Sequence, residues 1–359
     1  MKILCFIDSL GSGGAQRQMI ELAKAFKLKG CKVSFLTYHE NNFFKPELDE
    51  YNISVKTIIE PNYIKRLFKI RRAIRNHKPD AVLSFLEGAN FMATLAGFPI
   101  RKWRLVVGER SANQRIVKNL KLRLFRKAHF FTDFIVGNSN KNIELVKKII
   151  PLINKNKLKV IYNSVQIPDN NNFFIIESAI TKIVVAASYR ETKNLDGLIE
   201  AIFLLPDEYK LKLQINWFGH ITTDNKYYET QLNKIKKNNL GGVIVLNNHT
   251  NQIYEKYQKA DFVGLFSHYE GFPNAICEAM ARCKPIIVSK VSDVPIFIKE
   301  NENGFLCDSH DPKSIMEALI KAIDSSYLKR KYIGENNREI VSLYFDSEVI
   351  VNQYLELLK

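Results

Sequence analysis

The feature that most constrains the fold is an alternation of short apolar runs with amphipathic helical patterns along the whole chain. The runs in the first half are KILCFID, KVSFLTY, VKTIIE, AVLSFL, RLVVGE and FIVGNS. Those in the second half are KIVVAAS, KLQINWF, VIVLNN, FVGLFS, PIIVS and GFLC. Continuously apolar strands that alternate with helices predict parallel sheets buried on both faces.

The segment after the first run illustrates the helical half of this pattern. Its apolar residues form one stripe at helical spacing: Ala15, Met19, Leu22, Ala23 and Phe26. Such a stripe packs one side of a helix against a sheet. The series is interrupted once, near residues 164–178, where the run PDNNN is rich in turn formers. We therefore predict an α/β protein with two doubly wound domains whose ligands bind at the carboxyl ends of the strands, in a cleft.

Charge is distributed unevenly between the halves. Residues 1–165 carry 31 Lys and Arg against 12 Asp and Glu, a net charge of +19, whereas the remainder carries 22 against 25, a net of −3. This asymmetry indicates that the first half faces an anionic partner, either nucleic acid or an anionic membrane surface. The basic residues are densest in 64–78 and 115–127. Two interpretations of these stretches remain open: amphipathic helices with solvated charges, or helices attracted to lipid headgroups or a lipid diphosphate.

The sequence also argues against several classes of protein. No apolar run approaches the roughly 18–20 residues that span a bilayer, and we interpret MKILCFIDSL as a first strand and not as a signal peptide. The cysteines are scattered and odd in number: Cys5, Cys31, Cys277, Cys283 and Cys307. We expect buried free thiols in a reducing cytoplasm, and neither a disulfide framework nor a zinc site.

Two segments suit a bound phosphate. Gly13 and Gly14 lie where the first strand passes into a helix, so backbone N–H groups there could approach an anion. The run GSGG matches neither the dinucleotide-binding fingerprint nor the P-loop, and a tight turn with positive φ is the alternative. Arg190 and Lys193 similarly follow a strand and precede a helix, which suits a diphosphate, although a solvated pair with Glu191 would look the same.

The stretch YEGFPNAICEAM places two carboxylates around a turn. Glu270 precedes Gly271, which allows a tight turn, and Pro273 fixes φ near the first turn of a helix that Asn274 can cap. Glu278 follows about one helical turn later. A carboxylate accepts hydrogen bonds and therefore suits sugar or ribose hydroxyls. The alternative is an exposed helix-surface acid for Glu278 and a helix-dipole partner for Glu270.

This stretch resembles the signature of the family-four retaining glycosyltransferases, because EGFPNAICEA has two glutamates separated by seven residues. The similarity is strongest over residues 254–322 and weakest over 40–130, and GSGGAQ, IVGNS, VIYNSV and RETKN occur in the family's order. The resemblance implies the GT-B fold, with two Rossmann-like domains facing across a cleft. Its expected parts are an acceptor-side domain (1–165), a nucleotide-sugar domain (166–340) and a C-terminal helix (341–359) packing back toward the first domain.

By this resemblance Glu278 accepts hydrogen bonds from the ribose and Glu270 contacts hydroxyls of the donor sugar. Arg190 and Lys193 neutralise the leaving diphosphate. The remaining expected donor-binding positions act through backbone N–H groups: Gly13, Gly14, Gly271, Phe272, Asn274 and Ala275. Many members place the arginine five residues before the lysine, where this chain has Ser188. The segment VSDVPIFI also lacks the commoner glycine and glutamate of the family.

The resemblance implies transfer with retention, in which the departing phosphate takes the acceptor's proton and no protein nucleophile is needed. The chain contains no DxD triplet, so we expect cations and helix N-termini to stabilise the diphosphate without a metal or any cofactor. A UDP-sugar is expected ahead of a GDP-sugar as donor of a hexose-type sugar.

The acceptor is expected to be a glycan or a lipid-linked sugar of bacterial cell-surface polysaccharide synthesis. Candidate acceptor contacts are Glu87, Asn90, Glu109 and Arg110, which follow strand ends, although turn capping would explain them as well. We expect the protein in the cytoplasm, peripherally bound to the inner face of the cytoplasmic membrane. A nucleotide-sugar epimerase of the same fold is the alternative. A nucleic-acid-binding protein is disfavoured because no aromatic-interleaved basic run or known motif is present, so nucleic acid is not expected as a partner.

Overall fold

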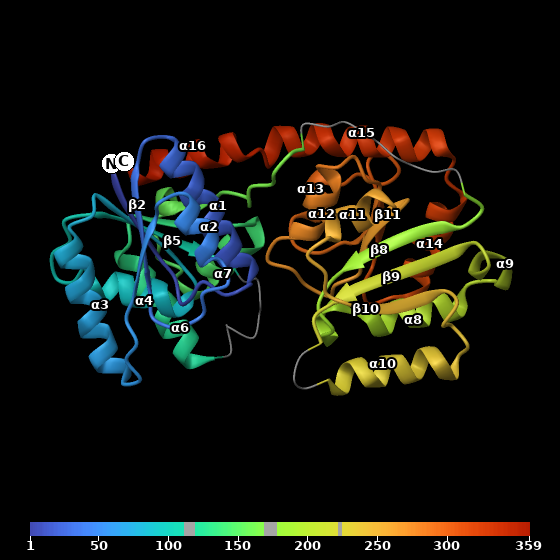
Figure 1. Cartoon of the computed structure of the whole chain (residues 1–359), viewed down its shortest axis with the longest axis horizontal. Coiled ribbons are helices and arrows are strands. Elements are labelled where there is room, and N and C mark those ends of the chain that lie inside the picture. The colour runs from blue at the N-terminus through green and yellow to red at the C-terminus, as the bar shows by residue number, and fades with distance from the viewer. Residues whose placement is uncertain (111–118, 169–177, 222–224) are drawn as a thin grey trace. The chain divides into compact units, whose positions relative to one another are not determined.

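The computed structural model describes residues 1–110, 119–168, 178–221 and 225–359. These residues form two compact units (Figure 1). Unit 1 contains Met1–Ser164 together with Ser347–Lys359, and unit 2 contains Val165–Asp346. Of the linker expected at 164–178, residues 169–177 lie outside the described ranges.

Unit 1 is built on a seven-stranded parallel sheet of order β3-β2-β1-β4-β5-β6-β7. In the described part of this unit the elements are β1 (Lys2–Phe6), α1 (Gly14–Leu28), β2 (Lys32–Thr37), α2 (Lys45–Glu50), β3 (Ser54–Thr57), α3 (Tyr63–His77), β4 (Ala81–Phe85), α4 (Glu87–Ala96), β5 (Arg104–Glu109), α6 (Leu120–Lys127), η1 (Ala128–Phe131), β6 (Phe134–Gly137), α7 (Asn140–Ile149), η2 (Lys155–Lys157), β7 (Leu158–Val160) and α16 (Ser347–Leu358). The strand order reverses between β1 and β4, which is the point where Rossmann-like sheets bind ligands.

Alternation along β1 shows how both faces of this sheet are buried. Ile3 and Cys5 pack on the face covered by α1, α2 and α16, whereas Leu4 and Phe6 pack on the face covered by α3, α4 and α7. This is the double burial that the continuous apolar runs predict. The predicted stripe of α1 is buried except for Ala15, which is half-buried, and Gln18 and Ile20 are buried with it.

Unit 2 is built on a six-stranded parallel sheet of order β10-β9-β8-β11-β12-β13, which reverses between β8 and β11. In the described part of this unit the elements are β8 (Thr181–Ala186), η3 (Glu191–Lys193), α8 (Leu195–Leu204), α9 (Asp207–Lys210), β9 (Leu213–Gly219), α10 (Lys226–Lys237), β10 (Ile244–Asn248), α11 (Ile253–Gln258), β11 (Phe262–Leu265), α12 (Asn274–Met280), β12 (Ile286–Ser289), α13 (Val294–Phe297), β13 (Phe305–Cys307), α14 (Pro312–Asp324) and α15 (Tyr327–Tyr344). Two doubly wound, Rossmann-like α/β domains were predicted, and this part of the prediction is confirmed.

The C-terminal segment 341–359, expected as one helix, contains a break. Helix α15 ends at Tyr344 in unit 2, and α16 begins at Ser347 in unit 1. Phe345 lies between them and is buried against the rings of Phe272 and Phe297. This aromatic packing holds the end of α15 on unit 2, and α16 completes the core of unit 1 beside α1.

The two basic stretches correspond to helices of unit 1. Residues 64–77 lie on α3, whose Ile70 and Ile74 are buried, and Lys78 is its C-cap. Residues 119–127 include α6, while 115–118 lie outside the described residues. Among the helices of the described ranges, none combines the length and the apolar character needed to cross a bilayer.

Candidate functional site

The carboxyl ends of β8 and β11 bring together two segments that are far apart in the sequence. These strands are paired neighbours, so their exits meet at the reversal point of the unit 2 sheet. Lys193 Nζ lies 2.6 Å from Glu270 Oε1. Ser267 Oγ donates a hydrogen bond of 2.6 Å to the same oxygen. The sheet thus assembles a cation and a carboxylate that the sequence indicated separately.

This ion pair is only partly shielded from solvent. The side chains of Lys193 and Glu270 are 24% and 12% exposed. Lys193 and Ser267 both contact Oε1 of the carboxylate, and no group in the described ranges hydrogen-bonds to Oε2. A partly exposed carboxylate with one oxygen fixed and the other open can accept a ligand hydroxyl in a defined direction. Ser267 was not singled out from the sequence, although a small polar residue at a strand exit is a usable signal.

Asn194 fixes the backbone beside Lys193. It adopts the left-handed conformation, with φ of 59°, and its Oδ1 accepts a hydrogen bond of 3.1 Å from the N–H of Gly197 at the start of α8. Its Nδ2 donates to Ser309 O at 2.7 Å. Asparagine tolerates this backbone region better than most residues. The N–H of His268 donates to Thr192 O at 3.0 Å, which ties the two strand exits together. Arg190 precedes this turn and is exposed.

The turn before α12 differs in detail from the expectation. Pro273 occupies the N-cap position and Asn274 is the first helical residue, so Asn274 does not cap the helix as predicted. The N–H of Asn274 donates to Phe272 O at 3.0 Å, and the ring of Phe272 is buried. Ser292 Oγ donates to Gly271 O at 3.1 Å. A hydrogen bond within the tight turn thus already engages one of the N–H groups expected to serve a donor.

Glu278 lies in the second turn of α12 and is half-buried, and Ala275 is half-buried in the first turn. The backbone carbonyl of Glu278 accepts a hydrogen bond of 2.9 Å from Arg282. The guanidinium of Arg282 lies over the ring of Tyr254, 3.5 Å from its centroid. This cation–π contact helps to hold Arg282 against the C-terminal end of α12.

The glycine-rich exit of β1 is a close approach, not a left-handed turn. Gly13 is the N-cap of α1 with φ of −81°, and Gly14 is the first helical residue. A Cβ at Gly13 would lie 2.2 Å from Gln16 Oε1. Gln16 in turn donates to Asp8 Oδ1 at 2.9 Å. A Cβ at position 13 would therefore meet only the movable end of the Gln16 side chain, and the positive-φ alternative does not apply there because the φ of Gly13 is negative.

At the exit of β4, unit 1 contains an unusual backbone conformation. Leu86 has φ of 75° and ψ of 147°, a region that side-chain-bearing residues rarely adopt. Glu87 follows it directly and begins α4. Asn90, another candidate acceptor contact, is buried, and its Nδ2 donates to Gly108 O at 3.0 Å. Asn90 thus ties α4 to β5 in this structure.

Glu109 is the centre of a buried ionic cluster. Its Oε2 lies 2.9 Å from Nε and 2.5 Å from Nη2 of Arg126. Its Oε1 lies 3.1 Å from His129 Nδ1. Nη2 of Arg126 also reaches Glu87 Oε1 at 3.3 Å. Burial by itself raises the pKa of Glu109, but the charge of Arg126 and the contact with His129 outweigh it and lower the pKa to about 2.

Sequence reasoning missed the roles of Arg126 and His129. Arg126 was grouped with the surface cations of 115–127, yet its side chain is 1% exposed. No local pattern distinguishes it from its exposed neighbours Arg123 and Lys127.

Arg110 joins the exit of β5 to the C-terminal helix. It donates to Asn163 Oδ1 at 2.7 Å and to the hydroxyl of Tyr354 on α16 at 2.5 Å. Its guanidinium also lies 3.6 Å from the centroid of the Phe85 ring. These three contacts engage Arg110 inside unit 1.

The comparisons with known proteins agree with this geometry. Residues 170–340 match the family described as "Glycosyl transferases group 1", and residues 12–167 match "Glycosyltransferase Family 4". The chain belongs to the family-four glycosyltransferases with the GT-B fold, and the resemblance predicted from the sequence is confirmed.

Three relatives illustrate the similarity. The chain is 25% identical to the N-acetylgalactosamine-N,N'-diacetylbacillosaminyl-diphospho-undecaprenol 4-alpha-N-acetylgalactosaminyltransferase of Campylobacter jejuni, over 99% of both chains. It is 26% identical to the capsular polysaccharide biosynthesis glycosyltransferase CapM of Staphylococcus aureus, over 80% of this chain and 78% of that one. The crystal structure of Anabaena HepE in complex with UDP superposes with a TM-score of 0.86 at 18% identity, covering 100% of this chain and 99% of that chain. At that identity the superposition supports the fold alone.

Proposed function

We propose that this glycosyltransferase is retaining and metal-independent, and that it moves a hexose-type sugar from a UDP-sugar to a glycan or lipid-linked acceptor in cell-surface polysaccharide synthesis. The observation that carries the proposal is the pair of Lys193 and Glu270 at the reversal point of the unit 2 sheet. That pair supplies a cation for a diphosphate beside a carboxylate for sugar hydroxyls.

The donor site follows from the two strand exits. Glu270 keeps Lys193 in place before the donor binds, and its open Oε2 accepts a sugar hydroxyl. Arg190 is exposed and can turn toward the diphosphate. Glu278 accepts hydrogen bonds from the ribose. The backbone around Gly271 and Ala275 lies between these carboxylates.

The proposed chemistry needs charge stabilisation more than proton transfer by the protein. Breaking the anomeric C–O bond leaves negative charge on the diphosphate and positive charge on the sugar ring. Arg190 and Lys193 stabilise the diphosphate as it leaves, which lowers the barrier because their interaction strengthens with that charge. The departing phosphate takes the proton of the acceptor hydroxyl, which attacks from the same face. In metal-dependent glycosyltransferases a metal ion supplies this positive charge, and here the two cations supply it.

The nucleotide and the acceptor are inferred from the relatives. HepE is described in complex with UDP-glucose, and the name of the Campylobacter jejuni relative specifies an acceptor linked to diphospho-undecaprenol. These names favour a UDP-sugar and a lipid-linked glycan for this chain.

Within unit 1 we propose that Glu87 contacts the acceptor. Its side chain is partly exposed, whereas Glu109 is buried between Arg126 and His129. We assign Glu109 to positioning Glu87 through Arg126. By the same reasoning Asn90 and Arg110 act on the acceptor site by holding the strand exits in place.

We also propose that unit 1 docks on the inner face of the cytoplasmic membrane. Not every cation of α3 is available for this, because Arg71 and Arg75 donate to backbone carbonyls between Leu95 and Ile100. The exposed cations of α3, its C-cap and α6 are Lys65, Lys69, Arg72, Lys78, Lys121, Arg123 and Lys127. Exposed apolar side chains accompany them: Ile64, Phe68, Leu120 and Leu124. This combination suits the interface of an anionic bilayer.

The proposal is tested by measuring sugar transfer from a panel of UDP- and GDP-sugars to polyprenyl-diphosphate-linked glycans, with products identified by mass spectrometry. Transfer with retained anomeric configuration from a UDP-sugar is expected. UDP should also raise the melting temperature, whereas duplex DNA should not. Epimerisation of a nucleotide sugar without an acceptor would instead indicate the epimerase, and failure of every donor to react would refute the proposal.

A further inference from the structure

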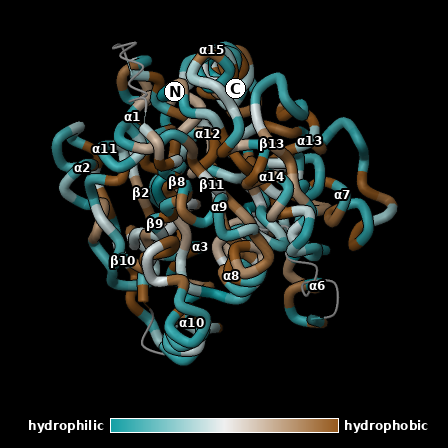
Figure 2. The backbone as a smooth tube through the Cα atoms, turned by 90° about the vertical axis from the view of Figure 1, so that its right-hand side faces the viewer, coloured by the Kyte–Doolittle hydropathy of each residue, from teal (hydrophilic) through white to brown (hydrophobic). Residues whose placement is uncertain are grey.

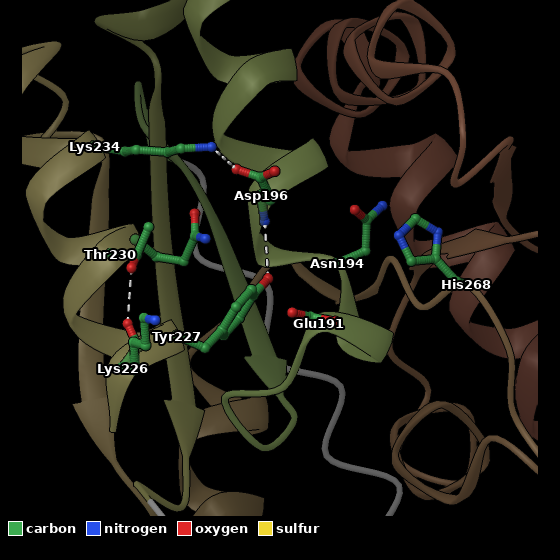
Figure 3. A pocket seen from close by; sticks show the side chains of 9 residues that line it. Glu191, Asn194, Asp196, Lys226, Tyr227, Thr230, Lys234 and His268 are labelled. Atoms are coloured by element: carbon green, nitrogen blue, oxygen red, sulfur yellow. Dashed lines mark hydrogen bonds and ion pairs between the residues drawn. The ribbon is translucent and has the colours of Figure 1, made fainter. Parts of the chain in front are cut away.

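A pocket of about 550 Å³ lies in unit 2 between the start of α8, helix α10 and the exits of β8 and β11 (Figure 3). Its volume is within the range of small-molecule sites. None of the donor-binding residues assigned above lines it. Asn194 and His268, which do line it, are one and two residues away from Lys193 and Glu270. The pocket therefore adjoins the proposed donor site without being part of it.

The polar walls of this pocket are held in fixed positions. The backbone N–H of Asp196 donates to the hydroxyl of Tyr227 at 3.3 Å. The carboxylate of Asp196 forms an ion pair with Lys234 of α10, and Figure 3 shows these groups on facing helices. Asn194 is held at both ends of its amide, as described above. A pocket whose groups are fixed in this way loses little freedom when a ligand binds.

Gln231 is the observation that points to a ligand. It lines the pocket from α10, which is largely hydrophilic (Figure 2), yet it is only 3% exposed. Its Oε1 is buried and has no hydrogen-bond partner among the described residues. Buried acceptors are nearly always satisfied, because leaving one unpaired destabilises the fold. A ligand hydroxyl in the adjoining pocket could donate a hydrogen bond to this Oε1.

The lining identifies the class of ligand. Two carboxylates, of Glu191 and Asp196, are balanced by two ammonium groups, of Lys226 and Lys234, which favours an uncharged ligand. His268 is stacked on His310 at 4.5 Å with Nδ1 3.3 Å from Ser309 Oγ. Burial and the charge of His310 lower the pKa of His268, so its imidazole is neutral near pH 7.

A neutral imidazole, amides and hydroxyls offer both donors and acceptors. A sugar presents the same two functions from every hydroxyl, and its ring can rest against the side chain of Tyr227. We propose that this pocket binds a neutral saccharide unit, in addition to the donor sugar and the acceptor hydroxyl. Assigning that saccharide to the glycan substrate or product rests on the proposed function. The hydrogen bond between His268 N and Thr192 O joins the pocket wall to the donor site.

The test uses the full chain saturated with UDP, so that the donor site is occupied. Binding of maltose, lactose and N,N′-diacetylchitobiose is measured by saturation-transfer NMR and calorimetry, with glucose and N-acetylglucosamine as monosaccharide arms. Disaccharide binding is expected, and tighter binding of disaccharides than monosaccharides would assign the site to a glycan chain. Comparable binding of monosaccharides would assign it to a free sugar and would support the saccharide site itself.

A matched pair of variants distinguishes this site from a structural role. Gln231→Met should weaken saccharide binding roughly three- to tenfold, leave UDP affinity unchanged, and maintain or raise the melting temperature because it removes the unpaired acceptor. Gln258→Met, at an exposed position on α11, should change none of these. The proposal is overturned if no saccharide binds while UDP does, or if Gln231→Met lowers the melting temperature without weakening saccharide binding. If the unmodified protein does not bind UDP, the proposed function, and not the saccharide site, is contradicted.

Discussion

The buried ion pair between Glu109 and Arg126 makes the stability of unit 1 depend on pH, and the size of this effect follows from the pKa of Glu109. The pKa of Glu109 in the folded protein is about 2, against 4.5 for an ordinary glutamate. This difference corresponds to about 3 kcal/mol of folding free energy. Because the folded pKa is the lower one, the stabilisation is fully present above about pH 5 and is lost progressively as the pH falls toward 2.

Substitutions remove this dependence in distinguishable ways. Arg126→Met should cost about 3–5 kcal/mol at pH 7, since it leaves the Glu109 carboxylate buried without its cation. Glu109→Gln should also destabilise unit 1, and it should flatten the loss of stability between pH 5 and 2. The double variant Arg126→Met/Glu109→Gln should lose less than the sum of the two, because neither charge is then buried alone.

The assay must separate the two units, because a protein with two units need not unfold in one step. Hydrogen exchange followed by mass spectrometry reports peptides of Met1–Ser164 separately from those of Val165–Asp346, and unit 2 serves as the internal control. The reasoning is refuted if Glu109→Gln shows the same acid dependence in unit 1 as the parent. A cost below about 1 kcal/mol for Arg126→Met would refute it equally, since breaking a buried pair costs more than that.

Three further predictions concern the donor and the membrane. Glu278→Ala should weaken UDP binding by about 1.5–3 kcal/mol, because ribose hydroxyls lose a charged acceptor; unchanged affinity in calorimetry would remove the ribose assignment. Lys193→Ala and Arg190→Ala should each lower kcat strongly while leaving the melting temperature nearly unchanged, and the exposed control Lys236→Ala should alter neither; parental turnover in both variants would contradict the mechanism. Activity should also survive EDTA, and a loss of activity that Mg²⁺ restores would contradict the metal-free mechanism. The protein should pellet with anionic vesicles at low salt and be released at high salt, since exposed charges are screened beyond roughly 8–10 Å and each docked cation contributes about 1 kcal/mol. Replacing Lys121 and Arg123 with Gln should reduce pelleting, and equal binding to neutral vesicles would exclude the electrostatic docking.

Much of the site could be anticipated because its signals are local. Gly271, Pro273 and the two glutamates around them lie within nine residues, so their order along the chain already indicates a strand exit, a turn and a helix. The detail within that turn could not be anticipated. Whether Asn274 caps the helix or begins it depends on the backbone angles at Pro273, and either is compatible with the same letters.

The exposure of a charged residue was the property least accessible from the sequence. Arg71, Arg75 and Arg126 belong to basic stretches and were interpreted as surface cations. In the structure Arg71 and Arg75 bind backbone carbonyls near the end of α4, and Arg126 is buried against Glu109. A cation has the same place in a helical pattern whether it meets solvent or a neighbouring helix, so the pattern cannot tell these apart.

The sequence by itself determined the two Rossmann-like units and the residues at their strand exits. Apolar periodicity sets which segments become strands and helices, and this information lies within short windows of the chain. Only the tertiary structure decided which of those exits meet. Lys193 contacts Glu270, which is 77 positions away in the chain, because β8 pairs with β9 on one side and with the distant β11 on the other. Strand order is set by the packing of the whole sheet, so partners across the reversal point follow from the fold and not from spacing.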